Sequence, residues 1–425
     1  MLDIQLIRKN SDLVREKLAK KGCNVDFSEF IELDQKRRSL IQQTEELKAL
    51  RNKVSAEIPM LKKEGKDIST RLADMKKVAE QIKDLDSELA TINEKQAIFL
   101  QALPNLPDDD LLPGGKENNK VLSVYGEKPQ FDFKPLHHVD IAEKLGLIDY
   151  NRGAKMAGSG FWVYTGDGAM LEWALLNYFV DQHLKDGYQM ILPPHMLNYA
   201  SGYTAGQFPK FVEDVYWLDH ENEHNSFMLP TAETALVNMY RDEILDEKEL
   251  PKRFFAYTPC YRREAGSYRA EERGMIRGHQ FNKIEMFQYT TKTGSDAAFE
   301  ELVKKACRLL EGLGLHYRLS KLAAGDCSAS MARTYDIEIW IPSMNDYKEV
   351  SSVSNARDYQ ARRGNMRYRD SQTGKIEFVH TLNGSGLATS RVFPAILEQY
   401  QTKDGKVRVP ESLQPYMHGK TILGQ

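Results

Sequence analysis

The chain has 425 residues, of which 41% are hydrophobic and 28% charged, as is typical of a soluble globular protein of two or three domains. Its formal net charge of −3 excludes a uniformly basic nucleic-acid coat but not one local basic surface. The four cysteines form neither a disulfide framework nor a CxxC metal pair, and we expect neither a signal peptide nor a membrane helix, because no apolar run is long enough for either. We therefore expect a protein of the reducing cytoplasm.

The first hundred residues are expected to form two long helices. Between residues 75 and 103, apolar side chains recur at alternating spacings of three and four, broken only by Gln96, which indicates a heptad seam. A weaker seam repeats every seven residues from Leu33 to Leu61, and Gly65 suits a chain reversal between the two. We predict an antiparallel coiled-coil hairpin as an N-terminal arm over residues 1–103, followed by a linker rich in proline and glycine at 104–120.

Basic residues gather toward the predicted tip of this arm. Two interpretations remain open, because the same charge can meet phosphates or form the solvated face of a dimerisation or spacer coiled coil. The residues that carry the nucleic-acid interpretation are Lys48, Arg51, Lys53, Lys62, Lys63, Lys66, Arg71, Lys76 and Lys77.

Residues 121–425 differ from the arm in their sequence pattern. Short β-rich runs such as "FFAYTP", "YDIEIWIP" and "KIEFVHTL" are mixed with helical stretches such as "AMLEWALLNYFVDQHLKDG". Because strands and helices do not alternate strictly, we predict an α+β domain on a mainly antiparallel sheet flanked by helices.

The segment from Tyr261 to Gln288 is unusually rich in arginine and glutamate. It is predicted to join two antiparallel strands, with Arg262, Glu264, Arg273 and Glu285 on or beside the hairpin. The arginine fork matches phosphate and carboxylate, and a neighbouring glutamate can accept bonds from an amino group. A structural network of ion pairs is the alternative interpretation.

Three further segments add polar residues. Asn383, Gly384, Ser385 and Gly386 are expected to form a tight polar loop before a helix that begins near Arg391, where the backbone favours anions. "TAE" supplies Thr231 and Glu233, and "EVSS" supplies Glu349, Ser351 and Ser352. A glutamate with serine hydroxyls suits Mg²⁺, although "EVSS" is equally compatible with an ordinary strand end.

Several common chemistries are missing from the sequence. There is no P-loop, no GxSxG elbow and no HExxH helix. The pair His137 and His138 is expected to lie in a strand or turn without a metal.

Taken together, "TAE", "RREAGS…RGMIRGHQFNKIE", "GD…YDIEIWIP", "EVSSVSN…QARR" and "HTLNGSGLA…R", in this order after a helical arm, resemble the bacterial-type seryl-tRNA synthetases. The resemblance covers essentially the whole chain. It implies a class II aminoacyl-tRNA synthetase, with a sheet of six or seven antiparallel strands flanked by helices. The implied reaction joins serine and ATP, with Mg²⁺, into seryl adenylate and pyrophosphate, and then esterifies the terminal adenosine of serine tRNA.

The resemblance also implies roles for individual residues. Serine would be surrounded by Thr231, Glu233, Glu285, Asn383 and Ser385. ATP would be bound by Arg262 at the α-phosphate, by Glu264 at the adenine, and by Arg273 and Arg391 at the outer phosphates. Glu349, Ser351 and Ser352 would complete the ATP site. Glu349 and Ser352 would also hold the metal. The arm would bind tRNA(Ser) across a homodimer, and tRNA(Sec) is a further implied substrate.

This sequence departs from the family pattern at several positions. Arg263 stands where serine is common, Thr389 and Ser390 replace the usual valine and glycine before Arg391, and Cys327 stands where methionine is frequent. These departures suggest the hypothesis of a second-copy enzyme that tolerates a serine-like inhibitor. A related ligase acting on another carrier and a non-catalytic RNA-binding descendant are the alternatives. The arm argues against the first, and the retained arginines argue against the second.

Overall fold

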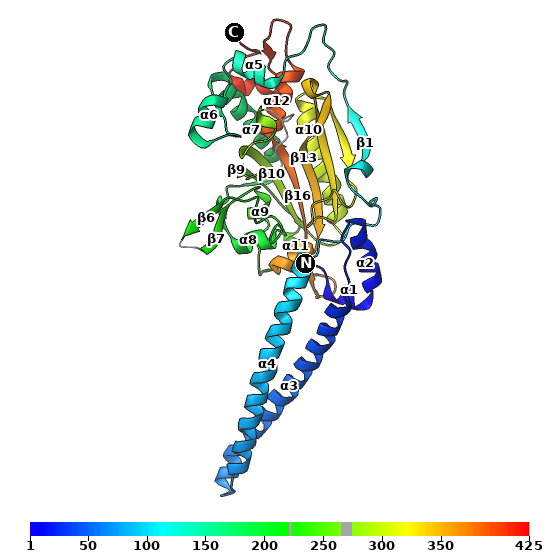
Figure 1. The fold of residues 1–425 in the computed structure, drawn as a ribbon, viewed down its shortest axis with the longest axis vertical. Helices are drawn as coiled ribbons and strands as arrows, with labels where there is room; N and C mark the ends of the chain where they lie inside the picture. Colours follow the sequence, from blue (N-terminus) through cyan, green and yellow to red (C-terminus); the bar gives the residue numbers. More distant parts are fainter. Residues whose placement is uncertain (221–222, 265–273, 425) are drawn as a thin grey trace. The chain divides into compact units, whose positions relative to one another are not determined.

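The computed structural model describes residues 1–220, 223–264 and 274–424, and the chain divides into two compact units (Figure 1). One unit comprises residues 2–16 and 23–103. The other comprises Met1, residues 17–22 and residues 104–425. Arg273, predicted to bind the outer phosphates, lies outside the described residues. No helix in the described part of the chain is both long and apolar enough to cross a membrane.

The first unit is dominated by a helical hairpin, which confirms the prediction of a coiled-coil arm. Its long helices are α3 (Ser28–Lys63) and α4 (Ser69–Ala102), and the short helix α1 (Ile4–Lys9) precedes them. Leu40 of α3 and Ile82 and Ile92 of α4 are buried. Toward the turn, the seam loosens, since α3 has no buried residue beyond Thr44 among its described residues. Ion pairs between the helices, such as Lys36 with Glu88 at 2.5 Å, supplement this thin core.

The second unit is built on an eight-stranded sheet, one strand more than the resemblance implies. In spatial order the strands are β1 (Lys120–Tyr125), β11 (Tyr317–Lys321), β12 (Arg333–Ile341), β13 (Asp346–Arg357), β16 (His380–Ala388), β10 (Gln280–Thr290), β9 (Lys252–Tyr261) and β4 (Gln189–Ile191). All neighbouring strands pair antiparallel except β4 with β9, which confirms the predicted sheet type.

Helices and smaller sheets complete this unit. The helices are α2 (Ser11–Lys20), whose last four residues belong here, α5 (His138–Lys144), α6 (Tyr150–Ala157), α7 (Gly166–Lys185), α8 (Tyr199–Thr204), α9 (Glu233–Leu236), α10 (Ser295–Gly312), α11 (Tyr359–Gly364) and α12 (Thr389–Gln399). The smaller sheets are β2 (Ile148–Asp149) with β3 (Val163–Tyr164), β5 (Met196–Asn198) with β7 (Glu223–Met228) and β6 (Trp217–His220), β15 (Ile376–Phe378) with β14 (Arg367–Arg369) and β8 (Ile244–Asp246), and β17 (Val407–Arg408) with β18 (Ile422–Leu423).

Strand alternation decides which side chains reach the site. On β10, Ile284 and Met286 point into the core that α7, α10 and α12 share, while Phe287 and Tyr289 join a second core on the opposite face. Because successive side chains of a strand alternate between faces, Lys283 and Glu285 share the face of Phe287. Lys283 and Glu285 therefore lie on the face of β10 opposite the core of α7, α10 and α12.

Two local predictions are wrong. Residues 383–386 are not a loop but lie inside β16, where Ser385 pairs with Glu285 and Asn383 with Phe287 of β10. The two histidines are in neither a strand nor a turn. His137 caps the N-terminus of α5, and His138 is its first residue, with its ring 2.7 Å from the Glu398 carboxylate.

Candidate active site

A buried network joins the side chains that the sequence assigns to serine. Glu233 accepts hydrogen bonds from Gln360 at 2.7 Å and from Asn383 at 3.1 Å. The same Asn383 amide donates to Glu285 at 3.3 Å, and Thr231 Oγ1 donates to Glu285 at 3.3 Å. Ser385 Oγ donates to Glu285 at 3.4 Å. The five predicted residues thus meet at one place, although they come from three segments of the chain.

One acceptor in this network is unused. Asn383 Oδ1 is buried and has no hydrogen-bond partner among the described residues. A buried, unpaired polar atom is costly, so this oxygen is suited to a donor that a ligand brings.

Lys283 is a member of the network that the sequence analysis missed. Its ammonium pairs with the carboxylate of Glu285 and lies 2.8 Å from Thr231 Oγ1. Two carboxylates and one lysine leave the buried cluster itself one positive charge short, and the charge of Arg262 acts on Glu233 from the border of the cluster. Burial, and then the neighbouring charge of Glu285, raise the pKa of Glu233 to about 7. The cluster is therefore suited to a ligand with an ammonium group.

Arginines and an aromatic ring adjoin the network. The Arg262 guanidinium stacks on the Phe281 ring at 5.4 Å and donates to the backbone oxygen of Pro230. Glu264 binds Arg277 at 2.6 Å. A polar cavity lies between these residues and is also lined by Lys283, Glu349, Ser385 and Arg391. The side chains can hold an anionic group beside a flat apolar surface.

An oxygen-rich cluster continues from this cavity. Ser352 Oγ lies 2.7 Å from Asp336 and 2.9 Å from Glu349. Burial, and then the charge of Glu349, raise the pKa of Asp336 well above its usual range. Arg391 lies 3.6 Å from Glu349 and, against the effect of burial, lowers the pKa of that carboxyl. Crowded carboxylates and a hydroxyl form a donor set that fits a hard divalent cation.

Ser351 and the arm residues lie differently. Ser351 is fully buried, and its hydroxyl donates to the backbone oxygen of Ser385 at 2.7 Å, so it supports β16 from within the sheet. On the arm, Lys48 pairs with Asp86, Lys66 with Glu64 and Arg71 with Glu57. The side chains of Lys53, Lys62, Lys63, Lys76 and Lys77 are exposed.

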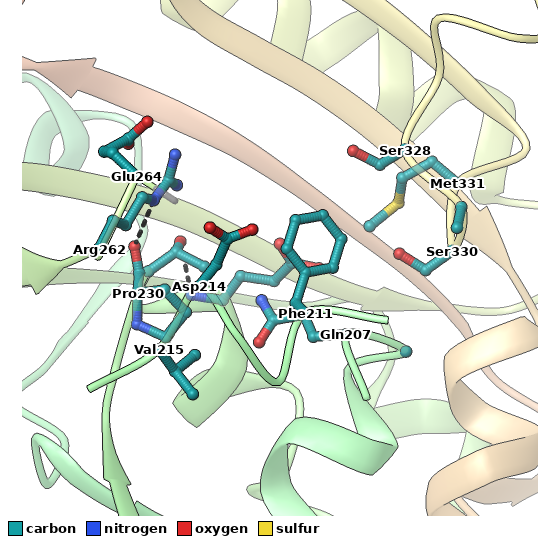
Figure 2. A pocket seen from close by; sticks show the side chains of 14 residues that line it. Gln207, Phe211, Asp214, Val215, Pro230, Arg262, Glu264, Ser328, Ser330 and Met331 are labelled. Atoms are coloured by element: carbon teal, nitrogen blue, oxygen red, sulfur yellow. Dashed lines mark hydrogen bonds between the residues drawn. The ribbon is translucent and has the colours of Figure 1, made fainter. Parts of the chain in front are cut away.

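Another cavity, of about 270 Å³, opens on the other side of Thr231 and Glu233. Figure 2 shows Arg262 and Glu264 on one side of it, Ser328, Ser330 and Met331 on the other, and Phe211 between them. Arg262 and Glu264 also line the polar cavity, so the two spaces share a border.

Among the described residues, His137, His138 and Glu398 form another candidate for a metal site, and their ligand atoms lie within 4.8 Å of one another. Glu398 already accepts hydrogen bonds from the backbone and ring of His138 and from the backbone and hydroxyl of Ser343. With these acceptor positions in use, the group serves to tie α5 to α12.

Sequence reasoning overlooked Lys283, Arg277, Phe281, Asp336 and Gln360. Lys283 and Phe281 could have been found from strand periodicity, because they alternate in phase with Glu285 on β10. Gln360 and Asp336 carry no such signal, since they reach the site from other elements.

Comparison with known proteins identifies relatives of both units. Residues 1–107 match the family "Seryl-tRNA synthetase N-terminal domain", and residues 216–400 match "tRNA synthetase class II core domain (G, H, P, S and T)". The chain is 62% identical to serine–tRNA ligase 2 of Clostridium acetobutylicum, with both chains covered completely.

Solved structures agree with this assignment. Seryl-tRNA synthetase from Pyrococcus horikoshii, complexed with ATP, matches with a TM-score of 0.91 at 33% identity, over 100% of this chain and 99% of that one. Cytoplasmic serine–tRNA ligase from Naegleria fowleri, in complex with AMP, matches with a TM-score of 0.88 at 29% identity, over 100% and 98%. Prolyl-tRNA synthetase from Giardia lamblia, at 15% identity, a TM-score of 0.58 and 65% and 55% coverage, shares the fold.

Proposed function

The chain belongs to the seryl-tRNA synthetases, which are aminoacyl-tRNA synthetases of class II, and from this membership we propose the reaction that it performs. It activates L-serine with ATP to seryl adenylate and pyrophosphate, and it then transfers serine to the 3′-terminal adenosine of tRNA(Ser). The selenocysteine tRNA, tRNA(Sec), is proposed as a second acceptor. The proposed location is the cytoplasm.

The observation that carries this proposal is the convergence of Thr231, Glu233, Glu285, Asn383 and Ser385 around a buried site that lacks one positive charge. The serine ammonium supplies that charge, beside Glu233 and Glu285. The serine hydroxyl finds polar partners in the same network, whereas alanine leaves them unpaired. Arg262, at the border of the two cavities, faces the bond that forms between the serine carboxylate and the α-phosphate.

The chain supplies positioning and charge rather than a nucleophile. In the proposed step, a carboxylate oxygen of serine attacks the α-phosphorus and pyrophosphate leaves. Arg262 neutralises the α-phosphate, Glu264 and the Phe281 ring hold the adenine, and Arg391 with Arg273 bind the outer phosphates. Glu349 and Ser352 are proposed to hold Mg²⁺, with Asp336 beside them. When bound, this ion offsets phosphate charge.

The cavity beyond Thr231 and Glu233 is proposed to receive the acceptor end of the tRNA. Once serine occupies the buried network and ATP the polar cavity, the space beside Phe211 remains. The ring of Phe211, 44% exposed, offers a surface on which a base can stack.

The proposed division of the chain assigns tRNA binding to the arm at 1–103, connection to 104–120 and catalysis to 121–425. The exposed basic residues of the arm are the proposed phosphate contacts.

A homodimer is proposed on the basis of an apolar surface on the second unit. Trp173 on α7, Leu192 after β4 and Met196 on β5 are 56%, 73% and 68% exposed, respectively. Large apolar side chains that are exposed to this extent are candidates for an interface. Sedimentation of a Leu192→Asp variant is expected to show monomers. A dimer unchanged by this substitution would place the interface elsewhere.

The decisive experiment for the reaction is amino-acid-dependent exchange between pyrophosphate and ATP, without tRNA. We expect exchange with serine and little with threonine, alanine, cysteine or glycine. Absence of exchange with every amino acid, in folded protein with Mg²⁺, would reject the proposal and favour a binding protein.

A further inference from the structure

A buried polar cluster lies beneath the proposed ATP site. It joins Glu172 of α7, Asn282 of β10 and Thr389, the first residue of α12. The Thr389 hydroxyl donates to Glu172 Oε1 at 2.6 Å and lies 3.1 Å from the backbone oxygen of Asn282. The Asn282 amide donates to the same Oε1 at 2.8 Å. Three elements thus meet at one carboxylate oxygen, and α7 and α12 pack together there (Figure 1).

The cluster connects directly to the proposed phosphate clamp. Thr389 lies two residues before Arg391, within the first turn of α12, and the residue that precedes this turn, Ala388, makes no side-chain cap. Arg391 in turn donates to the backbone oxygens of Glu349 at 2.5 Å and Ile276 at 3.4 Å. A bond that holds Thr389 therefore also holds the turn from which the guanidinium extends.

Glu172 is only 3% exposed, and the side chains that bond to its carboxyl are uncharged. The second carboxylate oxygen of Glu172, Oε2, has no hydrogen bond of normal geometry among the described residues. The hydroxyl of Tyr164 on β3 lies beside this oxygen, and it also has no hydrogen bond of normal geometry among them. Tyr257 of β9 faces the cluster and donates to Asn282, whereas β10 and α12 contribute neutral Asn282 and Thr389. Burial raises the pKa of Glu172 to about 7.

We propose that Glu172 is a positioning residue for ATP, which acts by holding Thr389 and with it the first turn of α12 that carries Arg391. This inference rests on the proposed role of Arg391. The hydrogen bond from Thr389 is strongest when the carboxyl is ionised, because charge-assisted bonds are stronger than neutral ones. ATP binding should therefore weaken as the pH falls through about 7.

The test compares Thr389→Val, Thr389→Ser and Glu172→Gln with the parent chain. MgATP binding is measured by calorimetry between pH 6 and 8.5, and the KM values for ATP and serine by pyrophosphate exchange. We expect Thr389→Val to weaken ATP binding about 3- to 10-fold at pH 8, from part of the lost charged hydrogen bond, and Thr389→Ser to restore it. Glu172→Gln should abolish the pH dependence. The KM for serine should change less than twofold.

Thr290→Val is the matched control. Thr290 is equally buried and lies on β10, but its hydroxyl donates to the backbone of Thr291, away from the site. The proposal is overturned if the parent and Glu172→Gln show the same pH dependence of ATP binding, or if Thr389→Val binds ATP normally. It is also overturned if the KM for serine rises as much as that for ATP. Because calorimetry needs no turnover, it tests the inference even if pyrophosphate exchange with serine fails.

Discussion

At the scale of single residues, Lys283 offsets the charge of one of the two carboxylates in the proposed serine site. It is the cation that pairs with Glu285, and it holds the Thr231 hydroxyl at the same time. Without it, the buried carboxylate of Glu285 would lose its ion pair, and the charges of Glu233 and Glu285 would repel each other more strongly. Its removal is therefore expected to disturb the whole network rather than one hydrogen bond.

The first prediction concerns Lys283→Met, which should lower serine-dependent pyrophosphate exchange about 100-fold or more. Removing one partner of a buried ion pair leaves an uncompensated charge, at a cost of about 3–5 kcal/mol. Lys305→Met is the control, because Lys305 is similarly buried and pairs with Asp186 outside the site. Equal losses in the two variants would contradict a specific role for Lys283.

The second prediction concerns the pH dependence of serine binding. Glu233 has a pKa of about 7, so it is neutral below that pH and attracts the serine ammonium less. The KM for serine should rise about tenfold from pH 8 to pH 6 and become independent of pH in Glu233→Gln. A pH-independent KM in the parent chain would refute this. Glu300→Gln, on the exposed side of α10, is the control.

The same carboxyl affects stability in the opposite direction. Its pKa in the folded chain is raised above the ordinary value of 4.5. It therefore contributes stability that is complete below about pH 4.5 and lost as the pH rises through about 7. Glu233→Gln should accordingly melt higher than the parent at pH 8, while both melt alike at pH 4.5.

At the scale of elements, the strand β16 packs closely against the helix α7 at Gly386, which faces His183. A Cβ on Gly386 would lie 2.2 Å from His183 Nε2, whereas one on Gly384 would first meet a Val353 methyl at 3.2 Å. His183 is fully buried and has no room to move aside. The close packing of the strand on the helix thus depends on the missing side chain.

The third prediction follows from this close approach. Gly386→Ala should destabilise the chain by about 1–3 kcal/mol, which is typical of overpacking, as measured by urea unfolding. Gly384→Ala on the same strand should cost less than half as much. A smaller effect at position 386 than at 384 would show that β16 and α7 adjust to the added methyl group.

The departures from the family pattern also belong to this scale. Cys327 packs in a small core with Leu111 and Leu322, and Thr389 is bound beneath the site. Neither lines the polar cavity beside the proposed serine residues, but Ser390, another of the departures, does. The second-copy hypothesis therefore stays a prediction, and a serine analogue that inhibits a relative with the usual residues but equally inhibits this chain would count against it.

At the scale of the whole molecule, activation of serine and recognition of tRNA are proposed to take place in different units. The arm has no cluster of catalytic side chains among its described residues, but exposed lysines flank its turn. This separation predicts that the two half-reactions respond differently to changes in the arm.

The fourth prediction is that reversing Lys62, Lys63, Lys76 and Lys77 to glutamate will weaken aminoacylation of serine tRNA at least tenfold and leave pyrophosphate exchange unchanged. The slope of log affinity for tRNA against log salt concentration should become shallower, by about one for each phosphate that is no longer neutralised. Reversal of Lys83 and Lys95, exposed elsewhere on α4, is the control. Equal effects of both sets would mean that charge acts only at long range.

Much of this architecture could be predicted from the sequence, because local patterns report local structure. The heptad spacing identified α3 and α4, and the short β-rich runs identified β9, β10 and β12. The loop predicted at 383–386 failed because glycine usually marks turns, whereas here Gly386 is needed for close packing against His183. His183 belongs to α7 and lies 203 residues earlier in the chain, so the local sequence around Gly386 does not reveal this contact.

The helical hairpin, the antiparallel sheet and the family could be predicted from the sequence alone, since these depend on periodicity and on motifs in a fixed order. Only the tertiary structure decided that Lys283 shares its network with Thr231, that Asn383 keeps an unpaired oxygen among the described residues, and that Glu172 lies under Thr389. The physical reason is that charge balance and hydrogen-bond satisfaction depend on distances between atoms of different elements. Those distances are set when the strands pair and the helices pack.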